Sequence, residues 1–234
     1  MSRGVVQSLE MGAKSLAPKQ ARSRESLRKL LKAAAEVLGQ HGVDGATIPR
    51  IAAHAGMTPG AVYRRFRDKE ALLEAVILRI LERQTERLEV SGLTVASAGR
   101  VPLAVLTEQL IGSMVVSYRS SAPLLRAMRQ FSQTRANTPF WRKATRLEVA
   151  AFERIVDLFL AHKAEIGHPD PKTAVPVALM MVIGTLFEVI VVSIQPGPLD
   201  KFLPEDAGLK RELTRAFLNY LGAPSSDMRT HHGG

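Results

Sequence analysis

The spacing of apolar residues predicts a chain of helices. Along most of the sequence, apolar positions recur every three or four residues, which places them on one face of a helix. No stretch shows the sustained alternation of apolar and polar residues that is typical of strands, so the sequence predicts an all-α fold. The expected helices span residues 23–42, 47–55, 59–66, 69–90, 102–119, 123–131, 139–165, 171–195 and 205–221.

Two short helices are expected in quick succession near the amino end. Thr47 can cap the first one, whose apolar face includes Ile51, and Gly56 ends it. Thr58 is a second N-cap candidate. Pro59 suits the first position of a helix, because the donor that proline lacks would have no partner there. The sequence therefore predicts a helical hairpin with a glycine-containing turn.

The second helix of this hairpin carries the candidate chemistry. Val62 and Phe66 share one face, while Tyr63, Arg64 and Arg65 are left for the other sides. Such a hairpin is a helix-turn-helix, whose second helix can lie in the major groove of DNA. An arginine there can donate two hydrogen bonds to guanine, which is worth about 1–3 kcal/mol of discrimination. Tyr63 is better suited to a phosphate, which fixes register without reading sequence.

The hairpin resembles the DNA-binding signature of the TetR family of one-component transcriptional regulators. The residues that carry the resemblance, in order and spacing, are Thr47, Ile51, Ala52, Ala55, Gly56, Gly60, Val62, Tyr63, Phe66, Lys69, Glu70, Leu72 and Leu73. The resemblance implies phosphate or base contacts from Thr47, Arg50, Thr58, Gly60, Tyr63, Arg64, Arg65 and Lys69. Pro49 departs from the family pattern, and it is tolerable only within an opening helical turn. Arg64 and Arg65 stand where the family often has an aromatic residue and a histidine, so the operator sequence does not carry over.

The same resemblance implies a helical C-terminal domain that dimerises. The helix expected at 171–195 is apolar almost all round, and one core cannot use that many apolar groups, so some are expected to meet a second subunit. In the TetR family the last two long helices pack against their copies, and we expect a homodimer through residues 171–221. The expected interface residues are Leu179, Val182, Ile183, Leu186, Ile190, Leu213, Phe217 and Tyr220.

The resemblance also implies a pocket for a small-molecule effector in this domain. The candidates are polar or soft residues set in apolar helices, namely Met114, Tyr118, Arg119, Phe131, Trp141, Phe152, Met180 and Glu188. For each of them, core packing or surface exposure is the alternative interpretation. Glu188 is the most informative candidate, because a carboxylate in so apolar a helix needs a partner.

These expectations divide the chain into segments with different roles. The helix at 69–90 rises about 1.5 Å per residue and so travels about 30 Å, which is enough to link two domains. Arginines near the amino end either enter a minor groove or only add solvated charge. The expected segments are a mobile basic arm at 1–22, a helix-turn-helix domain at 23–68, a connecting helix at 69–90, a helical ligand-binding and dimerisation domain at 91–222, and a disordered tail at 223–234.

Charge favours a polyanionic partner for the amino-terminal part. The formal net charge of the 234 residues is +10. Residues 1–70 hold 13 Lys and Arg against 6 Asp and Glu, whereas the rest hold 19 against 16. Most of the excess therefore surrounds the hairpin, and binding to DNA should weaken steeply as salt rises.

Several other classes of site are disfavoured. The chain has no cysteine, which removes thiolate metal sites and disulfides and favours a cytoplasmic protein. His41 and His54 have no carboxylate or histidine at ligand spacing, so we expect no metal and no cofactor. The apolar run at 174–194 approaches membrane-spanning length, but Pro176 and Glu188 within it favour a buried or interface helix.

The sequence thus predicts a transcriptional regulator rather than an enzyme. It has no Gly-rich phosphate loop, nucleophile triad or metal-spaced cluster. We expect a repressor that an effector releases from a DNA operator by moving the helix at 69–90. The alternatives are a constitutive or activating DNA-binding protein without an effector, and a nonspecific architectural protein, which would not need so large a C-terminal domain.

Overall fold

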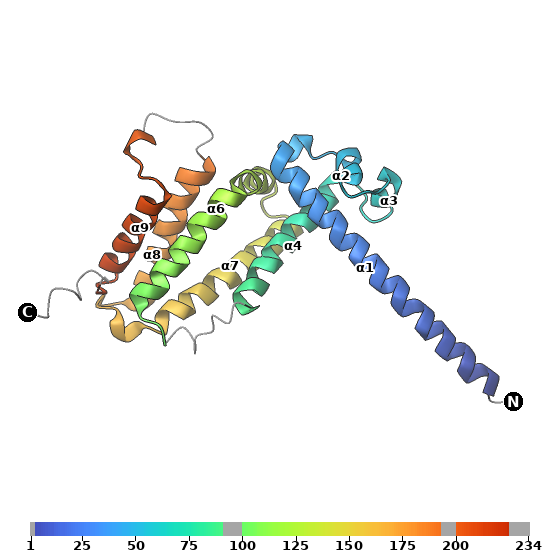
Figure 1. The fold of residues 1–234 in the computed structure, drawn as a ribbon, viewed down its shortest axis with the longest axis horizontal. Helices are drawn as coiled ribbons and strands as arrows, with labels where there is room; N and C mark the ends of the chain where they lie inside the picture. Colours follow the sequence, from blue (N-terminus) through green and yellow to red (C-terminus); the bar gives the residue numbers. More distant parts are fainter. Residues whose placement is uncertain (1–2, 91–99, 193–199, 225–234) are drawn as a thin grey trace, which may run out of the picture. The chain divides into compact units, whose positions relative to one another are not determined.

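The computed structural model describes residues 3–90, 100–192 and 200–224. The chain divides into two compact units, Met1–Arg79 and Ile80–Gly234, which are called here the N-terminal and C-terminal units. The described residues form helices and no strand, so the all-α prediction is confirmed (Figure 1).

The N-terminal unit is built on helices with one shared core. Its helices are α1 (Arg3–Gly45), α2 (Ile48–His54), α3 (Pro59–Tyr63) and the first half of α4 (Lys69–Val90). Each contributes apolar side chains at helical spacing, and these bury one another. The buried side chains include Leu30, Ala34, Val37, Leu38, Ile51, Ala52, Val62, Leu72, Leu73 and Val76. This core fixes the positions of the two short helices.

Helix α1 begins much earlier than the sequence predicts. It starts at Arg3 instead of Ser23 and continues through Pro18, so the expected boundary between an arm and a helix is absent from the described backbone. Residues 3–22 have no apolar period, and periodicity therefore could not reveal that this stretch is helical. At the other end, Gly42 has φ 67, a left-handed value that glycine adopts without strain.

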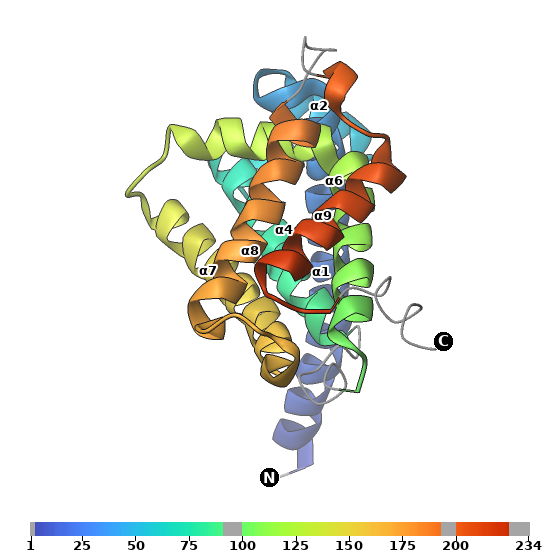
Figure 2. The same ribbon diagram turned by 90° about the vertical axis from the view of Figure 1, so that its left-hand side faces the viewer.

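The C-terminal unit contains the second half of α4 and a bundle of longer helices. Helices α6, α8 and α9 pack side by side, and α7 packs against α8 (Figures 1 and 2). In the core of this unit, the ring centroids of Phe159 and Phe217 lie 4.9 Å apart. Its elements are α6 (Leu103–Gln133), α7 (Pro139–Leu160), α8 (Pro171–Leu186) and α9 (Asp206–Tyr220), with the 3-10 turns η1 (Lys163–Glu165) and η3 (Asp200–Phe202) and the π-helical segment η2 (Phe187–Val192).

Two of the expected helix boundaries in this unit are wrong. The helices expected at 102–119 and 123–131 are one helix, α6, with Pro123 inside it. Pro123 cannot donate to the carbonyl four residues earlier, but it is exposed, so water can satisfy that group. The helix expected at 171–195 is α-helical only to Leu186 and continues as η2 to Val192, and residues 193–195 lie outside the described residues.

Side-chain N-caps begin four helices, and the caps predicted at Thr47 and Thr58 are confirmed. The hydroxyl oxygens of Thr58 and Thr138 each accept a hydrogen bond from the backbone N–H three residues later, at 3.3 Å and 3.1 Å. Thr47 does the same for α2. At α8, Asp170 accepts hydrogen bonds from Thr173, which lower the pKa of the Asp170 carboxyl. In each case a proline follows in the first turn, as the sequence pattern indicates.

Candidate nucleic-acid interface

Helices α2 and α3 form a tight hairpin whose inner side is buried. Gly56, at φ 67, adopts the left-handed conformation that turns the chain after α2. Val62 anchors α3 with none of its surface exposed, and Ile51 does so for α2. Because α3 spans only Pro59–Tyr63, its packing against α2 decides which of its side chains face outward.

The outward side of α3 is aromatic and cationic. Tyr63 is 55% exposed, although a ring of that size is usually buried more deeply. Arg64 and Arg65 follow it and are exposed. Arg67 is paired with the Asp68 carboxylate at 2.9 Å, whereas Arg64 and Arg65 make no ion pair within the described part of the chain. Two guanidinium groups are therefore available to an anionic partner.

The remaining predicted DNA-binding residues border this surface, and several also hold the local structure. The guanidinium of Arg50 donates to the carbonyl of Gly45 at 2.7 Å, and the ammonium of Lys69 lies 3.5 Å from the carbonyl of Asp44. Gly60 is exposed, and a Cβ there would meet only the guanidinium of Arg64, at 4.0 Å. Thr47 and Thr58 are exposed N-caps. A substitution at a cap or at Arg50 therefore affects folding as well as any contact with DNA.

His54 has a role that sequence reasoning missed. Its Nε2 lies 2.8 Å from a carboxylate oxygen of Glu36, which joins the end of α2 to α1. The second oxygen of Glu36 is 3.7 Å from the ammonium of Lys32. Sequence spacing can reveal pairs within one helix, such as Lys32 and Glu36, but not a contact between residues 18 positions apart. This contact helps to orient the hairpin on its supporting helix.

The structure does not gather the predicted effector-binding residues into one group. Met114, Tyr118 and Phe152 are partly buried against the main core of the C-terminal unit, and burial raises the pKa of the Tyr118 phenol. Phe131 is buried elsewhere, edge to face with Phe140. The other four candidates, Arg119, Trp141, Met180 and Glu188, are exposed. Arg119 is paired with Asp206 at 2.9 Å and so needs no ligand to balance its charge.

Most of the predicted interface residues face the interior of their own chain. Leu179, Val182, Leu186, Ile190 and Phe217 are at most 3% exposed, so a second subunit cannot reach them. Ile183 and Leu213 are half-buried, and Tyr220 is exposed. An all-round apolar helix gives no sequence signal for which side meets its own bundle. The outward side of α8 instead presents Met180 and Met181, which are 56% and 47% exposed.

The capped helical hairpin with exposed arginines has the geometry of the helix-turn-helix that DNA-binding proteins use. The sequence profile of the bacterial regulatory proteins, tetR family, matches residues 30–76. The uncharacterized HTH-type transcriptional regulator TtgW of Pseudomonas putida is 42% identical over 57 residues, which are 24% of this chain. The chain spans 42% of the length of TtgW.

Solved structures resemble the chain over most of its length. A TetR-family transcriptional regulator from Mesorhizobium loti MAFF303099 matches with a TM-score of 0.66 and 19% identity, over 85% of this chain and 97% of that one. FadR from Bacillus subtilis, in complex with stearoyl-CoA, matches with a TM-score of 0.60 and 16% identity, over 82% and 98%. The helix-turn-helix of this chain is therefore similar to that of TetR-family transcriptional regulators, and the chain shares the fold of solved structures from that family.

Proposed function

We propose that this protein is a sequence-specific DNA-binding regulator, acting in the cytoplasm as a repressor. The observation that carries the proposal is the outward side of α3, where Arg64 and Arg65 are exposed beside Tyr63 and have no ion-pair partner among the described residues. The two arginines read base edges in the major groove, while Tyr63 and Lys69 contact phosphates and set the register. Thr47, Arg50, Thr58 and Gly60 complete the phosphate-facing border.

The protein acts as a homodimer that reads a near-palindromic site. The helix formed by α8 and η2 supports this, because its most apolar window has a mean hydropathy of 2.4 but is only 39% buried. By length and composition it is the one described helix that could also cross a membrane. Exposed Met180, Met181 and Tyr220, with half-buried Ile183 and Leu213, supply apolar area for a second copy. A twofold dimer places its recognition helices about 34 Å apart, one turn of DNA.

A small-molecule effector bound in the C-terminal unit releases the operator. FadR, which shares the fold, is described in complex with stearoyl-CoA. Helix α4 belongs to both units, since the boundary between them falls after Arg79, within the helix. In its second half, Glu82 is paired with Lys143 of α7 at 3.2 Å. A ligand that favours one arrangement of α7 can therefore shift α4 and change the spacing of the recognition helices.

Selection of bound duplexes from a random DNA pool tests the proposal and yields the operator. We expect a near-palindromic consensus. Tyr63→Phe and Lys69→Ala should then weaken binding to all sequences, while Arg64→Ala and Arg65→Ala should relax the preference at particular base pairs. If both pairs of variants behaved alike, the division into reading and positioning residues would be wrong. Sedimentation at micromolar concentration would contradict the dimer if it gave a monomer.

A further inference from the structure

Positive charge in the C-terminal unit is concentrated in one segment. Residues 109–147 hold seven Lys and Arg and no Asp or Glu, whereas the rest of residues 80–234 hold 11 against 15. This basic segment covers most of α6 and the first part of α7. A charge distribution of this kind is not needed for helix formation, because mixed charge at spacings of three and four would stabilise the helices better.

Most of the cations in the basic segment already have partners. Arg119 and Lys143 are in ion pairs, and Arg142 donates to the carbonyl of Asn137. Arg135 stacks on the ring of Phe131, 3.6 Å from its centroid, and donates to the carbonyl of that residue. Arg126 and Arg129 differ from these, because they lie one helical turn apart on α6 and both contact the same turn of η2.

The two arginines are held in place with most of their donors unused. The Nε of Arg126 donates to the carbonyl of Val191 at 2.9 Å, and the guanidinium carbon of Arg129 lies 4.7 Å from the centroid of Phe187. The first contact uses one N–H of Arg126, and the second uses only the flat face of Arg129. Within the described residues, neither group forms an ion pair or a hydrogen bond beyond these contacts. Positioned guanidinium edges of this kind suit a carboxylate or a phosphate.

The surroundings favour an anion that is attached to an apolar body. Arg126 is half-buried, and the ring of Phe187 lies beside Arg129. A charge that is partly removed from water gains more from a partner ion than an exposed one does. Glu188, which also lies in η2, is exposed and already interacts within the chain. Its negative charge repels an anion bound to the same segment. A ligand therefore needs apolar contact in addition to its charge. The π-helical geometry of η2 also fits a binding role, since π segments are frequent at functional sites.

We propose that Arg126 and Arg129 form an anion site on η2 that binds the carboxylate or phosphate of an amphipathic ligand, with the apolar part of that ligand beside Phe187. The proposal rests on the proposed function, in that this ligand is the effector. It also connects binding to the helix that the proposed dimer uses, because Arg126 holds the carbonyl of Val191 at the end of the α8 and η2 helix.

Titration of the full chain with three matched probes tests the site. Octanoate, octyl phosphate and octan-1-ol share one apolar chain and differ only in the head group. We expect binding of at least one anionic probe, about ten- to a hundredfold tighter than that of octan-1-ol, because hydrogen bonds to charged groups contribute about 1.5–3 kcal/mol each. Octanoate alone would identify a carboxylate site, and octyl phosphate alone would identify a phosphate site.

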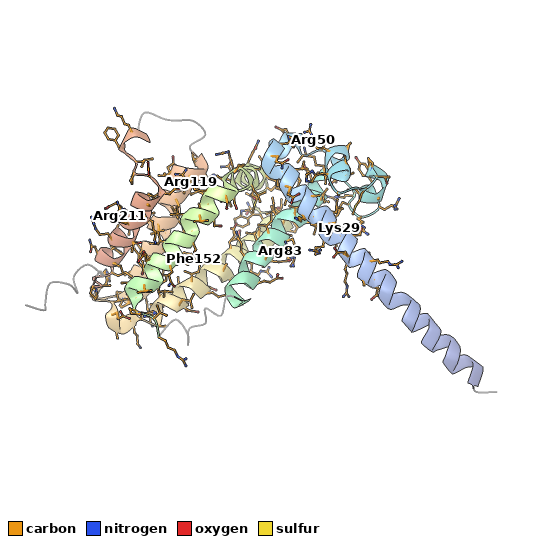
Figure 3. All side chains as sticks on the ribbon, in the orientation of Figure 1. Lys29, Arg50, Arg83, Arg119, Phe152 and Arg211 are labelled. Atoms are coloured by element: carbon orange, nitrogen blue, oxygen red, sulfur yellow. The ribbon has the colours of Figure 1, made fainter. Side chains whose placement is uncertain are left out.

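Single substitutions distinguish binding at Arg126 and Arg129 from attraction to the overall positive charge of the protein. Arg129→Gln should lower the affinity for the anionic probes about tenfold or more and leave the affinity for octan-1-ol unchanged. Arg126→Gln should do the same, and thermal unfolding checks that loss of its contact with Val191 has not unfolded the protein. Arg211→Gln, on α9 (Figure 3), is the matched control and should bind every probe like the unaltered protein.

Three results would overturn the anion site. They are equal binding of octan-1-ol, no binding of any probe, or unchanged affinity for the anionic probes in Arg129→Gln. If instead the two variants lost affinity for operator DNA without any ligand, the arginines would contact nucleic acid and not an effector. Operator binding by the unaltered protein is measured separately, so failure of the anion site leaves the proposed regulator function standing.

Discussion

The two units use their apolar residues in different ways. Among the described side chains of the N-terminal unit, Leu27 and Tyr63 are the exposed large hydrophobic ones, and Leu27 is only marginally so at 36%. The C-terminal unit exposes many, among them Val116, Met180 and Phe202, which are 69%, 56% and 72% exposed. In a unit whose apolar side chains are almost all buried, the exposed polar groups indicate the function. In a unit that exposes large apolar side chains, those side chains indicate a binding surface for a partner or a ligand.

Core truncation should give the largest effect and should show that the C-terminal unit has its own core. Phe159 is 1% exposed and packs on Phe217. Phe159→Ala should lower the free energy of unfolding by about 3–5 kcal/mol, because it leaves a cavity. Chemical denaturation measures this. The exposed Val149 provides the control, and Val149→Ala should change stability by less than about 0.5 kcal/mol. A small loss in Phe159→Ala would mean that the bundle is loosely packed.

The next largest effect should be a loss of operator affinity without a change in stability. Arg64→Ala and Arg65→Ala should each cost about 1–3 kcal/mol of affinity for the selected operator, because each removes a base contact. Their thermal midpoints should stay unchanged, since both side chains are exposed and form no ion pair in the described part of the chain. Arg211→Ala removes the same charge from the C-terminal unit and should leave operator affinity almost intact. Equal losses in all three variants would show that only net charge matters.

N-cap threonines in the two units allow a matched comparison. Thr138→Ala and Thr58→Ala should each lower the free energy of unfolding by about 1 kcal/mol, because each removes a hydrogen bond to a helix N-terminus. Only Thr58→Ala should also weaken operator binding, and Thr58→Ser should restore both properties. If Thr138→Ala weakened operator binding as much, the loss would reflect stability alone.

The smallest effect is a pH dependence at the start of α8. Hydrogen bonds from Thr173 lower the pKa of the Asp170 carboxyl in the folded state below its usual 3.8. A lowered folded-state pKa contributes stability that is present above pH 4 or so and is lost as the pH falls through the folded-state value. Denaturation at pH 5 and at pH 3 should therefore show that Asp170→Asn loses less stability on acidification than the unaltered protein. An identical loss in both proteins would remove Asp170 as a contributor.

Much of the N-terminal unit could be predicted from sequence because its signals are local. A cap, a proline or a glycine acts within one turn of a helix, so Thr58, Pro59 and Gly56 define the hairpin before any packing is known. The same local order predicts which side of α3 is exposed. The contact between His54 and Glu36 is not local, and no spacing rule indicates it.

In the C-terminal unit, the buried faces and helix boundaries could not all be predicted from sequence, because they depend on contacts between residues far apart in the chain. Leu186 and Met180 are both apolar and lie on one helix, yet Leu186 is buried and Met180 is exposed. The positions of the neighbouring helices α6, α7 and α9 decide between them. The boundary expected before Pro123 was wrong, because the free energy that a proline costs inside a helix depends on whether the carbonyl left without a donor is hydrated. The contact of Arg126, on α6, with η2 could not be predicted either, since a π-helical segment has no clear sequence signature.

A competition measurement tests the central claim most directly, that α3 reads duplex DNA. The full chain is bound to its selected operator, and unlabelled random DNA is added at physiological salt and at lower salt. The proposed function predicts that the operator is preferred by roughly 10³-fold or more, and that affinity falls steeply as salt rises. Absence of association with any duplex, even in dilute buffer, would contradict it.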